Sequence, residues 1–215
     1  MLNFFKIYRE YEPALIKDYM NSYRKYIHEI DFNIEKMAKN LEDDLAKTSR
    51  DELEDERYQD WLEEEVQNYN SFFPYTFRNS VLITSFSFFD KKLKEMCVYM
   101  QDMGKKKIKL DEIKGKNSLD RYRKYLIKVC DVRVDKIDDN WSRIINYWNM
   151  RNIIIHNNGI VDKKNDKKVR TFVNSEKELE INKDGYLFIK SSAFLNKVIG
   201  DLEDYLVFVA KRIKD

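Results

Sequence analysis

Three side chains suited to catalysis lie within six residues, in the segment RNIIIH that begins at Arg151 and contains Asn152 and His156. An arginine supplies a permanent cation for a phosphate, and an amide orients a ligand by donating and accepting hydrogen bonds. An imidazole changes its charge near neutral pH and can therefore transfer protons. Together these groups indicate acid–base chemistry at a phosphate ester.

The reaction that fits this set is attack of an RNA 2′-hydroxyl on the adjacent phosphodiester. The nucleophile belongs to the substrate, so the protein has only to remove its proton, stabilise charge and protonate the leaving oxygen. We expect His156 to be the base or acid, Arg151 to stabilise charge and Asn152 to orient the substrate. DNA lacks the 2′-hydroxyl and is expected to be inert.

The segment closes a predicted helix. Acidic and amide residues at 138–140 suit an N-cap and first turn, and Gly159 suits a left-handed C-cap. Apolar residues recur at helical spacing between these ends: Trp141, Ile144, Ile145, Trp148 and Ile155. Asn152 and His156 then share one face. A purely structural interpretation of His156 remains open, because a protonated histidine stabilises a helix C-terminus.

The segment RNIIIHNNG resembles the R-x4-6-H signature of the HEPN superfamily, small helical proteins of which many are RNA-cleaving toxins or anti-phage effectors. In that signature the residue after the arginine is Asn, Asp or His, and here it is Asn152. The resemblance covers about residues 75–215. Its second part is a core helix over 77–97, in which a serine and an acid precede a leucine; the corresponding residues are Ser87, Asp90 and Leu93. A branch regulated by a partner nucleotidyltransferase carries a tyrosine where this chain has Asn158, so that control is not implied.

The resemblance implies a metal-independent endoribonuclease of the toxin–antitoxin, abortive-infection or antiviral-defence type, with Asp90 orienting Arg151. The alternative is a non-catalytic HEPN-type module that binds RNA, a nucleotide or a protein. HEPN proteins typically dimerise, and a twofold axis at 151–156 would bring two copies of His156 to one site as base and acid. The expected partners are RNA, a second copy of the chain, and an antitoxin or defence-system protein.

The composition indicates a helical protein with a sizeable core. Of the 215 residues 43% are hydrophobic and 36% charged, with five glycines and two prolines. We find neither a run long enough to span a membrane nor a signal peptide. Cys97 and Cys130 are expected to be buried thiols in a reducing cytoplasm. Two distant histidines and no CxxC pair predict no metal site, and no cofactor is implied.

Charges are segregated along the chain, although the net charge is only +2. Acidic residues are dense over 42–65, either as a solvated helix face or as a segment that competes with RNA for a basic surface. A basic stretch follows, and we expect it to bind the RNA backbone through Lys105, Lys106, Lys107, Arg121 and Lys124. A solvated basic face is the alternative. A further polar, basic loop is predicted over 162–170.

These patterns predict a mainly α fold: a HEPN-like helical bundle over 73–215 with an N-terminal helical extension over 1–72, forming one compact unit. We expect a first helix over 13–45, with Pro13 in its first turn. The remaining predicted features are a second helix capped by Thr48 or Ser49 with an apolar side of Leu53, Trp61, Leu62 and Val66; a break at 71–74; a core helix over 77–104; a helix capped by Ser118; a β-hairpin drawn from 169–173, 179–181 and 186–190; and a final helix capped by Ser191 or Ser192.

Overall fold

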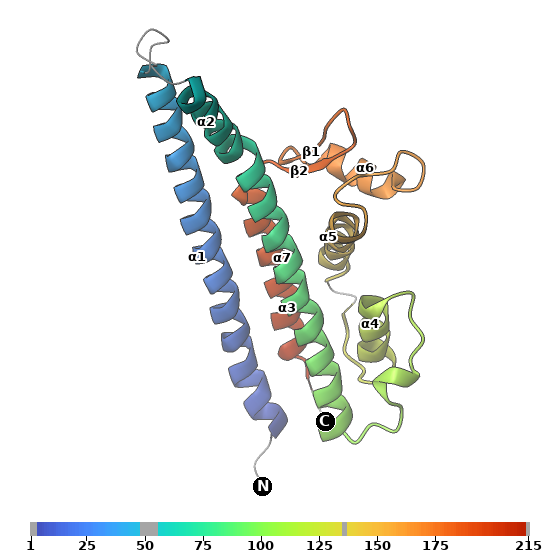
Figure 1. Cartoon of the computed structure of the whole chain (residues 1–215). Coiled ribbons are helices and arrows are strands. Elements are labelled where there is room, and N and C mark those ends of the chain that lie inside the picture. The colour runs from blue at the N-terminus through green and yellow to red at the C-terminus, as the bar shows by residue number, and fades with distance from the viewer. Residues whose placement is uncertain (1–3, 48–55, 135–136, 214–215) are drawn as a thin grey trace.

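The computed structural model describes residues 4–47, 56–134 and 137–213, and they form a mainly α-helical protein (Figure 1). In chain order the elements are α1 (Phe4–Lys47), α2 (Glu56–Gln67), the π-helical turn η2 (Asn68–Phe72), α3 (Phe73–Met103), the 3-10 turn η3 (Leu110–Glu112), α4 (Ser118–Lys128), α5 (Asp138–His156), α6 (Lys167–Ser175), β1 (Leu179–Ile181), β2 (Leu187–Ile189) and α7 (Ser192–Ala210). The predicted mainly α fold, with a small hairpin before the C-terminal helix, is confirmed.

Three long helices, α1, α3 and α7, lie side by side and contain most of the core (Figure 1). Helix α1 buries Ile16, Met20 and Ile27 at spacings of four and seven residues, which is one face of an α-helix. The same continuous core contains Leu93 of α3 and Leu202 of α7. The N-terminal helix is therefore packed into the bundle along its length.

Helix α1 begins nine residues before Pro13, at Phe4, so the prediction of Pro13 in the first turn was wrong. Phe5 is buried ahead of the proline, and the Arg9 guanidinium donates a 2.8 Å hydrogen bond to the carbonyl oxygen of Ile213. Tertiary contacts of this kind stabilise the added turns and outweigh the proline's missing N–H. Thr48, Ser49 and Leu53, expected to start the second helix, lie outside the described residues.

The predicted break at 71–74 is not a break, because α2, η2 and α3 follow one another as a single rod (Figure 1). In the π turn the N–H of Phe73 bonds to the carbonyl oxygen of Asn68, five residues back. Pro74 follows within the first turn of α3, where a missing N–H is tolerated. Trp61 was also misassigned: it is half exposed on α2, whereas Leu62 is buried.

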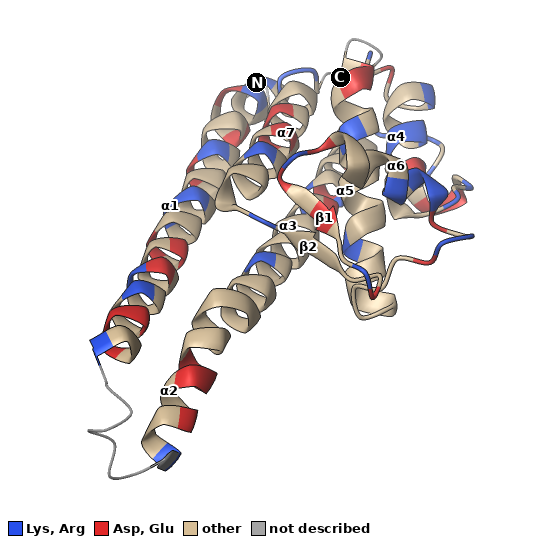
Figure 2. Ribbon diagram, turned by 90° about the horizontal axis from the view of Figure 1, so that it is seen from above, with Lys and Arg blue, Asp and Glu red and all other residues tan. Residues whose placement is uncertain are grey.

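The acidic part of the chain lies away from the basic helices. Acidic residues are frequent on α2 at one end of the molecule, while α4 and α6 carry Lys and Arg residues on the other side (Figure 2). Glu42 of α1 instead accepts a 2.6 Å hydrogen bond from Asn70 of η2. Within the described residues this separation favours the interpretation of the acids as a solvated face.

Residues 167–175 form helix α6, so the predicted strand over 169–173 was wrong. Val169 and Val173 are both buried. Residues four positions apart lie on one face of an α-helix and also on one face of a strand, so their spacing alone does not distinguish the two structures. The hairpin is confirmed farther on, where Leu179 pairs with Ile189 and Ile181 pairs with Leu187. Its turn ends at Gly185, whose φ of +92° suits glycine.

Candidate functional site

Helix α5 carries the RNIIIH segment and ends as the sequence predicts. Its buried face consists of Asn140, Ile144, Tyr147, Met150 and Ile153. This face differs from the predicted apolar set, in which Ile155 is in fact exposed. Gly159 has a φ of +80°, and its N–H bonds to the carbonyl oxygen of Ile153 at 3.1 Å. A Cβ at Gly159 would lie 2.5 Å from the Tyr75 hydroxyl oxygen, so the close approach also requires glycine.

Asn152 and His156 line the same groove, which has a volume of about 550 Å³. Its lining consists of Asn149, Asn152, Ile153, His156, Asn157, Lys164, Asn165, Asp166, Lys167, Lys168 and Val169. Asn152 is half-buried and His156 is exposed. The predicted shared face of Asn152 and His156 is therefore present, and it opens to solvent. We call this cavity the α5–α6 groove.

Arg151 lies beside the α5–α6 groove rather than in its lining. Its Nη1 donates a 3.0 Å hydrogen bond to Oδ1 of Asn152, and its Nε is buried without a hydrogen-bond partner. A guanidinium cannot accept hydrogen bonds, so the Asn152 atom that faces it must be the carbonyl oxygen. The Asn152 NH₂ group is consequently left as a donor for the groove.

The opposite wall of the α5–α6 groove is basic and was not assigned to the site from the sequence. It consists of the loop before α6 and the first turn of that helix, and it contributes Lys164, Lys167 and Lys168. The Asp162 carboxylate shapes this loop by accepting the N–H groups of Lys164 at 2.8 Å and Asn165 at 2.7 Å. The hydrogen bonds from Asn165 and Lys164 also lower the pKa of Asp162. The available signal was the basic loop that directly follows the motif.

Asp90 lies with α4, not with Arg151. The Ser118 hydroxyl donates a 2.7 Å hydrogen bond to the Asp90 carboxylate, and in the described part of the chain no ion pair joins Asp90 to Arg151. The neighbouring Phe89 contacts Tyr205, which packs on Trp141 in the first turn of α5. Arg151 lies ten residues farther along α5, about 15 Å at 1.5 Å per residue.

The predicted RNA-binding cations also lie at the far end of α5. Lys105, Lys106 and Lys107 follow α3, and Arg121 and Lys124 belong to α4. The N-cap of α4 is Asn117, which accepts the Asp120 N–H at 2.8 Å, rather than the predicted Ser118. Helix α4 is joined to the start of α5 by an Arg123–Asp138 ion pair. The length of α5, about 27 Å over 18 steps, therefore separates this surface from His156.

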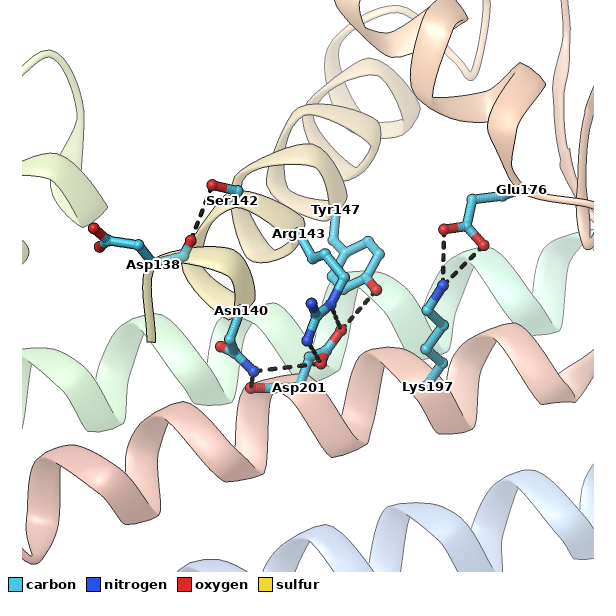
Figure 3. Close-up of polar contacts among 8 residues, drawn as sticks. All are labelled: Asp138, Asn140, Ser142, Arg143, Tyr147, Glu176, Lys197 and Asp201. Atoms are coloured by element: carbon cyan, nitrogen blue, oxygen red, sulfur yellow. Dashed lines mark hydrogen bonds and ion pairs between the residues drawn. The ribbon is translucent and has the colours of Figure 1, made fainter. Parts of the chain in front are cut away.

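A buried polar cluster fixes α5 on α7 (Figure 3). The Asp201 carboxylate accepts hydrogen bonds from Arg143 at 2.7 and 2.9 Å, from the Tyr147 hydroxyl at 2.8 Å and from the Asn140 amide at 3.3 Å. The hydrogen bonds that Arg143 donates to the Asp201 carboxylate raise the pKa of Arg143. Burial, and then the bond to Asp201, raises the pKa of Tyr147, so its hydroxyl stays protonated. We call these residues the Asp201 cluster.

Cys97 and Cys130 are free and buried, as the sequence predicts. Among the residues that the structure describes, no three His, Cys, Asp or Glu side chains are grouped so that they could hold a metal ion. None of the described helices is long and apolar enough to cross a bilayer.

No protein-family profile, curated protein or solved structure matches the chain.

Proposed function

We propose that the protein is a metal-independent endoribonuclease that cleaves RNA by attack of the 2′-hydroxyl on the adjacent phosphodiester. The observation that carries the proposal is the α5–α6 groove, in which Asn152 and His156 face Lys164, Lys167 and Lys168. Imidazole chemistry needs a phosphate held nearby, and lysines attract one without regard to sequence.

In this proposal His156 transfers protons, since its imidazole is exposed in the groove and forms no hydrogen bond with another described residue. The Asn152 NH₂ group donates to a phosphoryl oxygen, held in that orientation by its bond from Arg151. The three lysines neutralise charge on the strand. Arg151 contributes its positive charge from beside the groove and keeps Asn152 in place.

The HEPN resemblance extends the proposal to a homodimer joined at 151–156, with one His156 as base and the other as acid. The exposure of His156 leaves it accessible to a second copy of the chain. By the same resemblance, the proposed biological role is that of a cytoplasmic toxin or anti-phage effector with an antitoxin or defence-system partner.

A non-catalytic HEPN-type binding module is the second candidate. The observation in its favour is the position of Arg151, whose guanidinium bonds to Asn152 and lies outside the lining of the groove. A binding module needs the lysines but not a free imidazole. The two candidates therefore differ in whether RNA that binds is also cut.

The test is an incubation of the purified protein with labelled RNA in EDTA, alongside a DNA strand of the same sequence. We expect RNA products that end in a 2′,3′-cyclic phosphate and no cleavage of DNA. Binding without cleavage would favour the module. Equal cleavage of DNA, or activity that is lost in EDTA, would contradict the proposed mechanism.

A further inference from the structure

A second groove, of about 390 Å³, lies where the rod of α2, η2 and α3 meets the hairpin. It is lined by Glu64, Gln67, Asn68, Ser71, Phe72, Tyr75, Tyr186 and Phe188. Two of its rings, Tyr75 and Phe188, contact each other with centroids 5.1 Å apart. Two others face solvent, with Phe72 exposed by 58% and Tyr186 by 38%. We call this cavity the aromatic groove.

The π turn η2 forms one side of the aromatic groove. Its hydrogen bond spans five residues rather than four, so one extra residue enters the turn and the following side chains rotate relative to an α-helix. Ser71 and Phe72, at the end of the turn, line the aromatic groove, whereas Phe77, one turn into α3, is buried. Such π turns are frequent at functional sites.

The aromatic groove adjoins the chain that leaves the candidate catalytic segment. The Tyr75 hydroxyl lies against Gly159, and Ile160 forms an antiparallel bridge with Tyr186. Gly159 and Ile160 follow His156 by three and four residues. Four residues of fully extended chain span at most about 14 Å, so the Cα atoms of His156 and Ile160 lie within that distance of each other, which a short single RNA strand can span.

The two grooves have complementary chemistry. None of the described residues that line the aromatic groove is Lys or Arg, so the groove does not suit a phosphate. Its rings offer flat faces for stacking, and Glu64, Gln67 and Asn68 offer an acceptor and two amides for the edge of a base. Stacking on aromatic side chains is the general way in which proteins bind unpaired bases.

We propose that the aromatic groove binds an unpaired nucleobase of the same RNA strand whose phosphate lies at His156. This inference rests on the proposed function for its choice of ligand. It makes single-stranded RNA the substrate class, because a base in a duplex does not present its face to a side chain. It also assigns Phe72 and Tyr186 to substrate binding.

The test compares Phe72→Ala with a matched control, Phe32→Ala, since Phe32 is 54% exposed on α1 and does not line the aromatic groove. The probes are a single-stranded oligonucleotide with 2′-fluoro sugars, which cannot be cleaved, and an abasic strand of the same length. Loss of one stacked base costs roughly 5- to 150-fold in affinity. We expect this loss for Phe72→Ala with the base-bearing strand and no change with the abasic strand. Tyr186→Ala is expected to act in the same direction, and Phe32→Ala to leave both affinities unchanged.

Equal affinities of Phe72→Ala and the unmodified protein for the base-bearing strand would overturn the proposal, as would an equal loss for the abasic strand. Thermal unfolding of each variant separates loss of fold from loss of binding. Because the probe resists cleavage, this result is independent of catalysis. If Phe72→Ala shows the base-dependent loss but the unmodified protein never cuts RNA, base binding in the aromatic groove is supported and the nuclease proposal is refuted. If the protein cuts RNA and Phe72→Ala shows no such loss, the nuclease proposal is supported and base binding in the aromatic groove is refuted.

Discussion

At its N-terminal end α5 is held on α7 by the Asp201 carboxylate and its three partners, whereas at its C-terminal end Asn152 and His156 face an open groove. The first end uses polar groups to fix one helix on another inside the protein. The second leaves polar groups available to a ligand. The motif was visible in the sequence because its residues lie within six positions, whereas Asp201 lies 54 to 61 residues from its partners.

The two ends of α5 are also expected to differ in what a substitution affects, which is stability at the Asp201 end and activity at the His156 end. Removing a buried carboxylate leaves its donors without partners, so the cost falls on folding. Removing an exposed imidazole costs little folding energy, so any large effect must fall on function. Four experiments test this division, from the largest expected effect to the smallest.

His156→Ala should reduce the rate of RNA cleavage by about 10²–10⁴, the usual contribution of a positioned acid–base group. Its melting temperature and RNA affinity should stay unchanged, because the side chain is exposed and the lysines provide the affinity. The matched control is His28→Ala, which removes the chain's only other histidine, exposed on α1. Full activity of His156→Ala would remove the imidazole from the mechanism.

Asp201→Ala should lower the free energy of unfolding by about 3 kcal/mol, at the low end for a broken buried ion pair. The low end applies because the Arg143 side chain is 39% exposed and can regain water. For a protein of this size the loss corresponds to roughly 6–12 °C in melting temperature. The control is Lys197→Met, which breaks the more exposed Lys197–Glu176 pair, seen beside the cluster in Figure 3. It should cost less than about 1 kcal/mol, and an equal cost for both variants would show that the Asp201 cluster is no anchor.

The double change of Lys167 and Lys168 to Ala should lower the salt dependence of RNA binding. Each lost phosphate contact on a single strand reduces the slope of log K against log salt by about 0.7, so the pair should reduce it by about 1.4. Between 1 M and 0.1 M salt, the affinity of the variant for RNA should therefore increase about 25-fold less than that of the unmodified protein. Changing Lys105 and Lys106 to Ala removes the same charge at the far end of α5. A larger effect there would place the RNA backbone on the surface first predicted from the sequence.

Mixing unmodified protein with His156→Ala protein tests the composite dimer site. After co-refolding, subunits assort at random, and a dimer with one His156 should be inactive if both imidazoles serve one phosphodiester. Activity should then fall as the square of the unmodified fraction, to about one quarter at equal mixing. A straight line, with about one half remaining, would indicate independent sites in each subunit. Light scattering over a concentration series checks that the protein is dimeric.

Sequence periodicity predicted the helices well where one face is buried, as in α3 and α7. It failed over 167–175, because Val169 and Val173 fit a helix as well as a strand over so short a run. It also failed at Pro74, where a π turn lets the rod continue. In both places the outcome depends on neighbours far away in the chain: Phe172 packs on Tyr147 of α5, and Tyr75 packs on Phe188 of the hairpin.

The sequence alone determined the local features of the candidate site: a helix that ends shortly before Gly159, and Asn152 and His156 on one face of it. These follow from spacing and from the backbone freedom of glycine, which act within a few residues. Only the tertiary structure decided which cations face that pair. Lys167 and Lys168 lie near it because α6 packs on α5, whereas Lys105 and Arg121 lie at the opposite end of α5. It also decided that Asp90 bonds to Ser118. Charge and residue type are written in the chain, but the distance between two side chains from different helices is set by how those helices pack.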